Sequence, residues 1–175
     1  MSEPIIRDAV PSDAAAVRAI YAPYVEGTAI SFERTPPDET AMRERIERSI
    51  ASHAWLVAER EGRILGYAYA GPFAVRAAYR YTAEVSVYVD RNAARGGVAR
   101  ALYARLLDRL RERGMHSAIA IIALPNEASI RLHEAFGFEH VGTFRETGRK
   151  LGRWHDVGWW QLMLGDGEPD GRDDA

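Results

Sequence analysis

A turn rich in arginine and glycine separates an apolar alternating segment from an amphipathic one, with the sequence Arg95-Gly96-Gly97-Val98-Ala99-Arg100. If a helix follows this turn, its first backbone N–H groups have no partner within the helix, and the helix dipole adds positive charge there. The glycines keep side chains out of the way. The turn is therefore suited to binding a phosphate group. An ordinary strand-to-helix turn with solvated arginines fits the spacing equally well.

A second chemical feature is a carboxylate inside an apolar strand. Residues 81–89 alternate in polarity, which places Glu84, Ser86 and Tyr88 on one face of the predicted strand. A carboxylate in the middle of a central strand is costly to bury without a role or a partner. Burial also raises its pKa toward the range in which a carboxylate removes protons near neutral pH. Glu84 is thus a candidate general base, and a cross-strand partner for an arginine is the alternative.

Hydrophobic periodicity predicts the elements that position these groups. The predicted strands cover residues 4–8, 55–59, 64–70, 81–89, 116–124, 138–145 and 156–164. One helix is capped by Ser12, and the others cover 38–52, 97–113 and 127–136, the last capped by Asn126. The apolar centre of 116–124 predicts burial on both faces. This order predicts an α/β or α+β layered domain with a mixed, mainly antiparallel sheet and about four flanking helices.

Length and composition exclude several classes of function. The chain has 175 residues, which suits one domain, and its formal net charge is −2. Nothing in this balance favours nucleic acid or a membrane as a partner. The chain has no cysteine, which excludes disulfides and thiolate chemistry. We expect a single domain over residues 1–164, an acidic flexible tail over 165–175 and, without a visible export signal, a cytoplasmic location.

The order of elements around this turn resembles the Gcn5-related N-acetyltransferase (GNAT) family. Gly97 and Ala99 match the last two positions of the family's motif at the strand-to-helix turn, whereas Ala94 stands where Gln or Arg is expected. A wider likeness, over about residues 5–164, is to the phosphinothricin acetyltransferase subgroup, whose related enzymes acetylate methionine sulfoximine and methionine sulfone. It rests on five segments: Tyr69-Ala70-Gly71-Pro72, Glu84-Val85-Ser86-Val87-Tyr88-Val89, Leu124-Pro125-Asn126, Arg131-Leu132-His133-Glu134-Ala135 and Trp154-His155-Asp156-Val157-Gly158.

The resemblance implies a GNAT fold whose strands splay apart at the cofactor site, and transfer of an acetyl group from acetyl-CoA to the α-amine of a small amino acid or analogue. It implies that Arg95, Gly96, Gly97, Val98, Ala99 and Arg100 hold the pyrophosphate of CoA. Val87, Tyr88 and Val89 would lend backbone groups to the pantetheine arm. Asn126 would contact the cofactor in addition to capping its helix.

The resemblance also implies three catalytic residues. Glu84 would act as the general base, and Tyr103 as the acid for the departing CoA thiolate, although an aromatic on an apolar helix stripe is often a core residue. His133 would serve as a second base or a substrate contact, and a buried core histidine is the alternative. With no cysteine and no outstanding Ser or Thr nucleophile, direct attack is expected rather than an acyl-enzyme.

On the acceptor side, the resemblance implies that Arg76 holds the carboxylate of the substrate, with Tyr79 beside it and Phe32 as an aromatic wall. His155 and Asp156 are interpreted as structural, or as part of a pocket completed by a homodimer. No metal site is expected. Other acceptors, namely a polyamine, an aminoglycoside or a protein N-terminus, remain alternatives, as does an acyl-CoA-binding module without activity.

Overall fold

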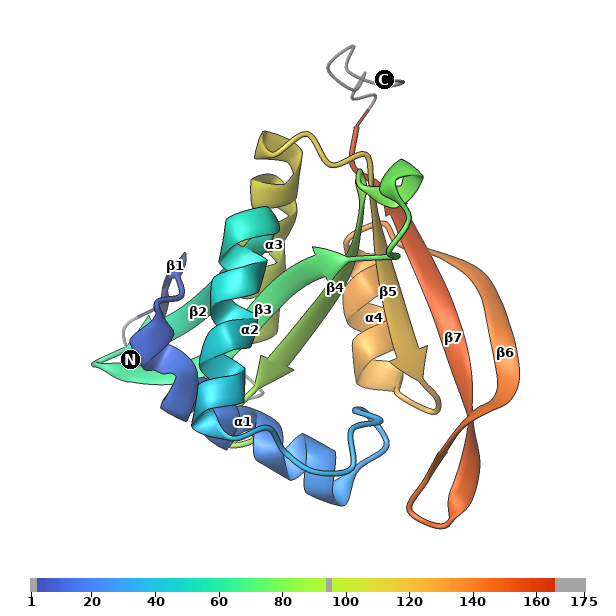
Figure 1. Ribbon diagram of the computed structural model, residues 1–175, viewed down its shortest axis with the longest axis horizontal. Coiled ribbons are helices and arrows are strands. Elements are labelled where there is room, and N and C mark those ends of the chain that lie inside the picture. The colour runs from blue at the N-terminus through green and yellow to red at the C-terminus, as the bar shows by residue number, and fades with distance from the viewer. Residues whose placement is uncertain (1–2, 94–95, 166–175) are drawn as a thin grey trace.

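The protein folds around one sheet, seen in a computed structural model that describes residues 3–93 and 96–165 (Figure 1). The described strands lie in the order β1-β2-β3-β4-β5-β7-β6, with β4 and β5 parallel and the other neighbours antiparallel. The strands are β1 (Ile5–Asp8), β2 (Ala54–Arg60), β3 (Arg63–Pro72), β4 (Thr82–Val89), β5 (Ser117–Ala123), β6 (Glu139–Lys150) and β7 (Arg153–Met163). The helices are α1 (Ala14–Gly27), α2 (Glu39–Ser52), α3 (Val98–Glu112) and α4 (Glu127–Ala135), with short 3-10 helices η1 (Pro11–Asp13) and η2 (Ala77–Tyr79). The predicted layered fold is confirmed.

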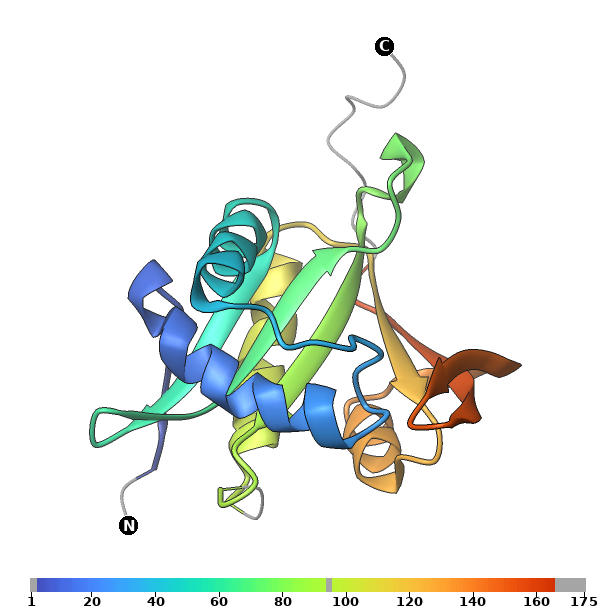
Figure 2. The same ribbon diagram turned by 60° about the horizontal axis from the view of Figure 1, so that its bottom comes forward.

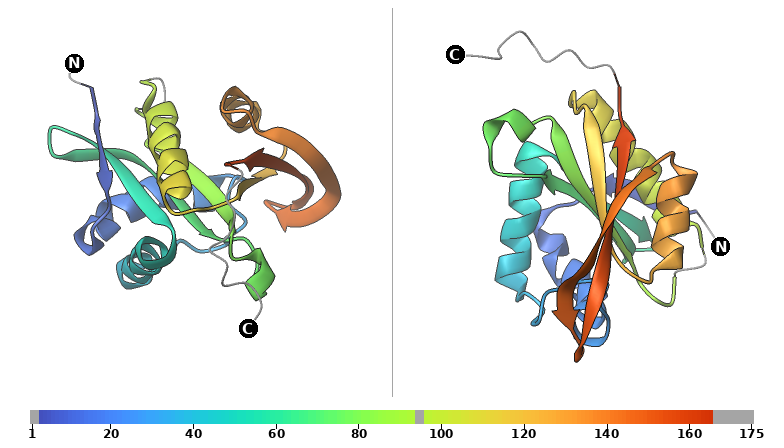
Figure 3. Two further views of the ribbon diagram at one scale, coloured as in Figure 1. Left: turned by 90° about the horizontal axis from the view of Figure 1, so that it is seen from above. Right: turned by 90° about the vertical axis from the view of Figure 1, so that its right-hand side faces the viewer.

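Helices cover the two faces of the sheet unequally (Figures 2 and 3). On one face α3 lies across β2, β3 and β4, and α4 lies beside β5. On the other face α1 and α2 cover β2 and β3, whereas no described helix covers β5, β7 and β6. Each covered face has its own hydrophobic core. The sheet therefore has one half with two buried faces and one half with a face left open.

The interior of the sheet opens between β4 and β5. Their parallel pairing includes only three residue pairs, from Thr82 with Ser117 to Glu84 with Ile119. Beyond these pairs β5 continues along β7, and β4 continues along β3. The two strands splay apart as expected, and this opening is the structural basis of the site.

One predicted helix cap is wrong. Ser12 lies within η1, and the helix begins at Ala14. The reason is Asp13, whose carboxylate is held by Arg7 at 2.7 Å and accepts the backbone N–H of Val10 at 2.8 Å. These contacts shape the turn before the helix and leave Ser12 no capping role. Asp38, by contrast, caps α2 by accepting the N–H of Ala41.

The last two strands are longer than predicted. They cover 139–150 and 153–163 rather than 138–145 and 156–164, and join through a tight turn at Leu151 and Gly152, both with positive φ. The second half of β6 is polar because β6 is an exposed edge strand, and in the sequence such a polar stretch has the composition of a loop. The prediction that 116–124 is buried on both faces holds for residues 117–120 and fails at Ile121, whose side chain is 37% exposed because it faces the uncovered half of the sheet.

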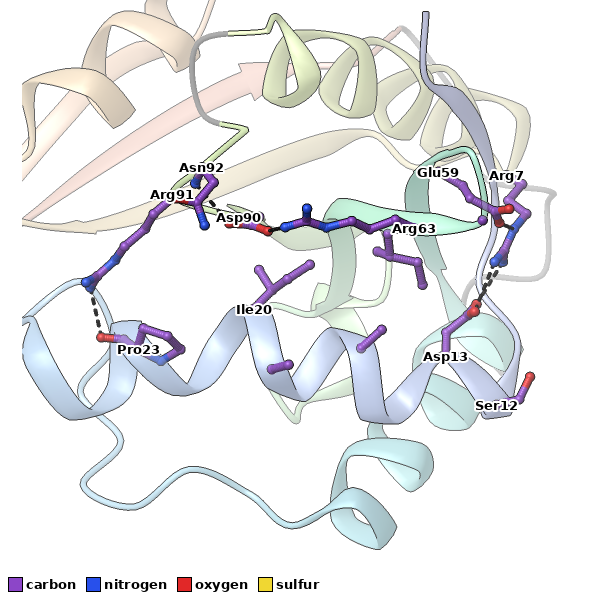
Figure 4. A pocket seen from close by; sticks show the side chains of 14 residues that line it. Arg7, Ser12, Asp13, Ile20, Pro23, Glu59, Arg63, Asp90, Arg91 and Asn92 are labelled. Carbon is purple, nitrogen blue, oxygen red and sulfur yellow. Dashed lines mark hydrogen bonds and ion pairs between the residues drawn. The ribbon is translucent and has the colours of Figure 1, made fainter. Parts of the chain in front are cut away.

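A groove of about 750 Å³ runs along α1 (Figure 4). Its charged side chains satisfy one another: Arg7 pairs with Asp13, Arg63 pairs with Asp90, and Arg91 donates to a backbone carbonyl of α1. The ion pairs and hydrogen bonds across the groove therefore hold α1 against the sheet. None of the predicted catalytic residues lines the groove.

Candidate active site

A narrow cavity of about 50 Å³ marks the opening between β4 and β5. It is lined by residues 85–88 of β4, residues 120–123 of β5, the start and middle of α4, and Ile30 from the loop after α1. On this side the backbone groups of β4 beyond Glu84 have no strand partner. Because buried backbone donors and acceptors need partners, an extended amide-containing ligand can pair with this edge of β4.

Of the three β4 residues predicted to contact the cofactor through their backbone, two line the cavity and one does not. Val87 and Tyr88 line the cavity, and the side chain of Tyr88 packs against Tyr21 and Tyr24 under α1. The carbonyl of Val89 already accepts a hydrogen bond from the Tyr24 hydroxyl at 2.6 Å. Val87 and Tyr88 therefore offer free backbone edges, whereas Val89 lies outside the cavity lining.

The turn before α3 has the geometry that an anion site needs. Gly97 is the N-cap residue and has a φ of 72°, which favours glycine. The first helical hydrogen bond runs from the Ala101 N–H to the Gly97 carbonyl at 3.0 Å, so the N–H groups of Val98, Ala99 and Arg100 have no intrahelical partner. A Cβ added at Gly97 would meet nothing within 4 Å, so the approach is open.

Two further cofactor candidates flank this turn. The guanidinium of Arg100 lies 5.6 Å from the ring centroid of Phe136, which brings it between α3 and α4. Asn126 lines the cavity, and its side chain accepts the backbone N–H of Ser129 at 3.2 Å, so the predicted helix cap is confirmed. Gly96 precedes the N-cap, whereas Arg95 and Ala94 lie outside the described residues.

Tyr103 and His133 form a buried pair on the α3–α4 face of the sheet. The Tyr103 oxygen lies 2.6 Å from Nε2 of His133, and both side chains are buried. Nδ1 of His133 lies 2.7 Å from the Ser129 carbonyl oxygen, which can only accept, so Nδ1 carries the proton. Nε2 is then the acceptor, and the Tyr103 hydroxyl donates to it. The sequence predicted that both residues lie on the apolar faces of their helices, but it did not predict the hydrogen bond between them.

Burial sets the charge states of this pair. It lowers the pKa of His133, which keeps the imidazole neutral near pH 7, and raises the pKa of Tyr103, which keeps the phenol protonated. His133 lines the cavity, whereas Tyr103 lies behind it. The pair is thus an uncharged hydrogen-bonded unit that reaches the opening through His133.

Glu84 lies on the opposite face of the sheet, at the last residue pair before β4 and β5 part. Its carboxylate is half-buried, and burial raises its pKa. Within the described parts of the chain no arginine pairs with it, so the alternative of a cross-strand ion pair finds no partner there. A half-buried carboxylate with a raised pKa at the end of the opening has the properties of a general base.

The loop that carries Phe32 is held in place by β6. The Lys150 ammonium donates to the carbonyl of Ser31 at 2.6 Å and to that of Val25, which fixes the loop against the end of α1. The ring of Phe32 packs directly on the backbone of Gly148, where a Cβ would lie 2.2 Å from it. Phe32 therefore forms a wall between the loop after α1 and the β6–β7 hairpin.

Arg76 and Tyr79 lie on another part of the molecule, the loop containing η2 (Figure 1). Arg76 is exposed, and Tyr79 makes an edge-on ring contact with Phe73 at 5.6 Å. Figures 1 and 3 both show η2 and the loop after α1 at opposite ends of the sheet opening. The structure therefore does not bring Phe32 together with Arg76 and Tyr79 within one chain.

His155 and Asp156 do not form a catalytic pair. His155 is buried, with Nε2 at 3.1 Å from the Lys150 carbonyl, and Asp156 accepts the backbone N–H of Glu146 at 2.8 Å. These contacts hold the bulged end of the β6–β7 hairpin, which agrees with the structural interpretation. Nowhere in the described parts of the chain do three His, Asp or Glu side chains gather as a metal site requires. None of the described helices has the length and hydrophobicity to cross a bilayer.

Several polar groups on the Glu84 face of the sheet have no predicted role. Tyr69 faces the same side of the sheet, directly opposite Ser86 in the β3–β4 pairing, and burial raises the pKa of its hydroxyl. Arg45 of α2 donates to both carboxylate oxygens of Glu33, at 2.6 and 2.9 Å. The period-2 alternation of residues 64–70 was the available signal for Tyr69. No local pattern predicts the Glu33–Arg45 pair, because a loop brings the two residues together.

Known proteins share both the sequence and the fold. The family described as "Acetyltransferase (GNAT) domain" matches residues 6–159. A phosphinothricin N-acetyltransferase of Streptomyces viridochromogenes is 44% identical over 156 residues, which cover 89% of this chain and 85% of that protein. An L-methionine sulfoximine/L-methionine sulfone acetyltransferase of Salmonella typhimurium is 37% identical over 160 residues, covering 91% of this chain and 94% of that protein.

Among solved structures, a GNAT superfamily phosphinothricin acetyltransferase from Sinorhizobium meliloti, crystallised with AcCoA, superposes with a TM-score of 0.91. It is 37% identical, and the match covers 95% of this chain and 91% of that one. The splayed strands, the glycine turn before α3 and these matches lead to one conclusion: the chain belongs to the GNAT acetyltransferase family.

Proposed function

We propose that the protein transfers the acetyl group of acetyl-CoA directly to the α-amine of a small amino acid or amino-acid analogue. The observation that carries this proposal is the opening between β4 and β5, which has Glu84 on one face of the sheet and the Tyr103–His133 pair on the other. The relatives named for phosphinothricin and for methionine sulfoximine or sulfone support an acceptor of this class.

Acetyl-CoA fits the residues that line the opening. The free N–H groups at the start of α3 and the positive end of its dipole suit a pyrophosphate, and Arg100 and Arg95 add charge. The unpaired edge of β4 at Val87 and Tyr88 suits the amides of the pantetheine arm. Bound there, acetyl-CoA supplies an activated thioester, and a backbone N–H of β4 stabilises the oxyanion that develops on its carbonyl.

Glu84 prepares the acceptor. An α-amine is mostly protonated at neutral pH and must lose a proton before its lone pair can attack the thioester carbon. The half-buried carboxylate takes that proton, directly or through a water, and passes it to solvent. Attack then forms the C–N bond, and collapse of the tetrahedral intermediate breaks the C–S bond.

Tyr103 completes the proton balance. Its hydroxyl, which lies behind His133 and outside the cavity lining, would leave Nε2 of His133 to protonate the departing thiolate, and would then regain the proton that the acetylated nitrogen gives up. A thiolate is a fairly good leaving group, so this assistance contributes little to the rate. His133 holds Tyr103 in place and contacts the acceptor from the cavity. Because the chain has no cysteine, no thioester on the enzyme intervenes.

Arg76, with Tyr79 beside it, holds the acceptor, whereas Phe32 lies at the other end of the opening and would contact the same small molecule only from a second copy of the chain. The planar fork of an arginine binds a carboxylate at two points, and the exposed position of Arg76 leaves its guanidinium available for one. Tyr79 supports that loop through Phe73, and Phe32 forms an aromatic wall at the other end of the opening.

The test is release of CoA thiol from acetyl-CoA in the presence of a panel of amines. Methionine sulfone, methionine sulfoximine and phosphinothricin are expected to be acetylated faster than spermidine, an aminoglycoside or a short peptide. Preference for one of the latter three would overturn the acceptor class. Tight binding of acetyl-CoA without transfer to any amine would instead favour an inactive binding module.

The same proposal includes a homodimer in the cytoplasm, where acetyl-CoA is available. Support for the dimer comes from the face of β5, β7 and β6 that no described helix covers, where Ile121 and Phe144 are exposed beside Trp159. A second copy that covers this face would remove apolar surface from water. Light scattering after gel filtration is expected to give twice the 19.5 kDa chain mass, and the mass of a single chain would contradict it.

A further inference from the structure

A second groove, of about 520 Å³, lies between α2 and the β2–β3 pair. It lies on the same face of the sheet as Glu84. Its floor is a stack of aromatic rings in which Trp55 lies 4.4 Å from Tyr69 and 5.4 Å from Tyr67 between ring centroids. Met42 of α2 forms the apolar wall opposite. Trp55, Tyr67 and Met42 are themselves almost fully buried, so the groove has an apolar base, which suits apolar or aromatic groups.

The groove leads to the proposed base. Gly71, which lines the groove, lies directly opposite Glu84 in the β3–β4 pairing. A Cβ added at Gly71 would meet nothing within 4 Å, so the space beside Gly71 is open on the face of the sheet that carries Glu84. Tyr69, which lies directly opposite Ser86 in the same pairing, is at the same end of the groove. A molecule whose amine lies at Glu84 therefore has open space for its side chain along the groove.

The charges around the groove have one sign. Two arginines of α2 line it, and none of its described lining residues is acidic. Arg45 is neutralised by Glu33, whereas Arg48 is mostly exposed and lies 3.7 Å from Glu44. The single proton of the Ser49 hydroxyl is shared between the carbonyls of Ala54 and Ala70 and is not free for a ligand. The groove thus suits neutral or anionic side chains and opposes cationic ones.

We propose that this groove is the subsite for the side chain of the acceptor, and that it selects α-amino acids with long apolar or aromatic side chains over small or cationic ones. The inference rests on the proposed function, since it takes Glu84 as the point where the amine lies. It extends that function by naming the part of the acceptor that the α2 side of the molecule recognises.

The kinetic test compares phenylalanine with alanine, and norleucine with trimethyllysine, whose side-chain nitrogen cannot be acetylated. We expect kcat/KM for phenylalanine to exceed that for alanine by about tenfold or more, since an apolar pocket discriminates by about that much for each missing group. Norleucine should likewise exceed trimethyllysine. Equal values within either pair would overturn the proposal.

A filling variant localises the effect. Ala51 lines the groove from the exposed side of α2, so Ala51→Trp places a bulky ring in it without touching Glu84. The matched control is Glu47→Trp, which adds the same ring to an exposed position of α2 outside the groove. Ala51→Trp should raise KM for phenylalanine about tenfold and leave alanine within twofold. Equal effects on both acceptors, or the same effect in the control, would contradict the assignment.

A binding measurement separates this proposal from the proposed function. Calorimetric titration with the products, N-acetylphenylalanine and N-acetylalanine, needs no turnover. Tighter binding of the aromatic product, lost in Ala51→Trp, supports the groove even if no acetyl transfer is observed. Acetyl transfer with no preference between the two products would overturn the groove and leave the proposed function intact.

Discussion

The two sides of the opening between β4 and β5 are built differently. On the cofactor side, the start of α3 and the edge of β4 present backbone groups, and the Tyr103–His133 pair behind them is uncharged. On the acceptor side, we propose that recognition depends on side chains from β3, α2, η2 and the loop after α1, with Glu84 as the ionisable group at the centre. Backbone sites tolerate most side-chain changes, whereas side-chain sites change specificity easily. We infer that substitutions on the two sides affect different kinetic constants.

The largest effect is expected from Glu84→Gln, which removes the proposed base. It should lower kcat/KM by about 10²- to 10⁴-fold. In the wild-type protein kcat/KM should fall as the pH drops through the raised pKa of Glu84, because the protonated carboxyl cannot accept a proton. A pH–rate profile that is unchanged in Glu84→Gln would remove Glu84 from the mechanism.

Thermal unfolding of the same Glu84→Gln variant provides the control for its stability. Because burial raises the pKa of Glu84 in the folded state, the charged form opposes folding at neutral pH and the protonated form does not. Glu84→Gln should therefore unfold at a slightly higher temperature than wild type at pH 8, and the difference should shrink as the pH falls through the folded-state pKa and disappear below the lower pKa of the unfolded chain. Loss of activity with retained stability distinguishes catalysis from misfolding.

The next effect tests the carboxylate contact. Arg76→Ala should raise KM for methionine sulfone about tenfold or more, since charge-assisted hydrogen bonds contribute about 1.5–3 kcal/mol. The amide of the same acceptor lacks the carboxylate and should be acetylated equally by both proteins. KM for acetyl-CoA should not change. An equal loss for acid and amide would show that Arg76 acts on the loop rather than on the substrate.

A smaller effect is expected on the cofactor side, where backbone groups at the start of α3 are proposed to bind acetyl-CoA. Gly97→Ala forces an L side chain into a φ of 72°, at a cost of about 1 kcal/mol, and should raise KM for acetyl-CoA about tenfold by distorting the turn. Gly114→Ala is the matched control, because Gly114 has the same φ at the other end of α3 and an equally open Cβ position. Both variants should lose similar stability. A raised KM in both would assign the effect to strain alone.

The smallest kinetic effect is expected from Tyr103→Phe. A few-fold loss of kcat should accompany a larger loss of stability, about 1–3 kcal/mol, because Nε2 of His133 is left buried without its donor. Stopped-flow and thermal unfolding measure the two quantities separately. A kcat loss as large as that of Glu84→Gln would show that Tyr103 contributes to the rate as much as Glu84 does.

The sequence predicted the acetyl-CoA side of the site in more detail than the acceptor side. The glycine turn, the Asn126 cap and the stripe that includes Tyr103 are local patterns within 87–133, where a few residues decide the conformation. The extent of β6 and the exposure of Ile121 were missed, because both depend on which face of the sheet a helix covers. The wider match to a family supplied the substrate class, which spacing alone did not.

By itself, the sequence determined the order of elements, the glycine turn before α3 and a carboxylate on a central strand, because hydrogen bonding within a few residues and periodic burial act locally. The tertiary structure decided that Glu84 and the Tyr103–His133 pair lie on opposite faces of one opening. It also decided that α2 encloses a groove ending beside Glu84. Those relations depend on packing between segments far apart in the chain, where the side chains that meet are selected by the fold and not by their neighbours in sequence.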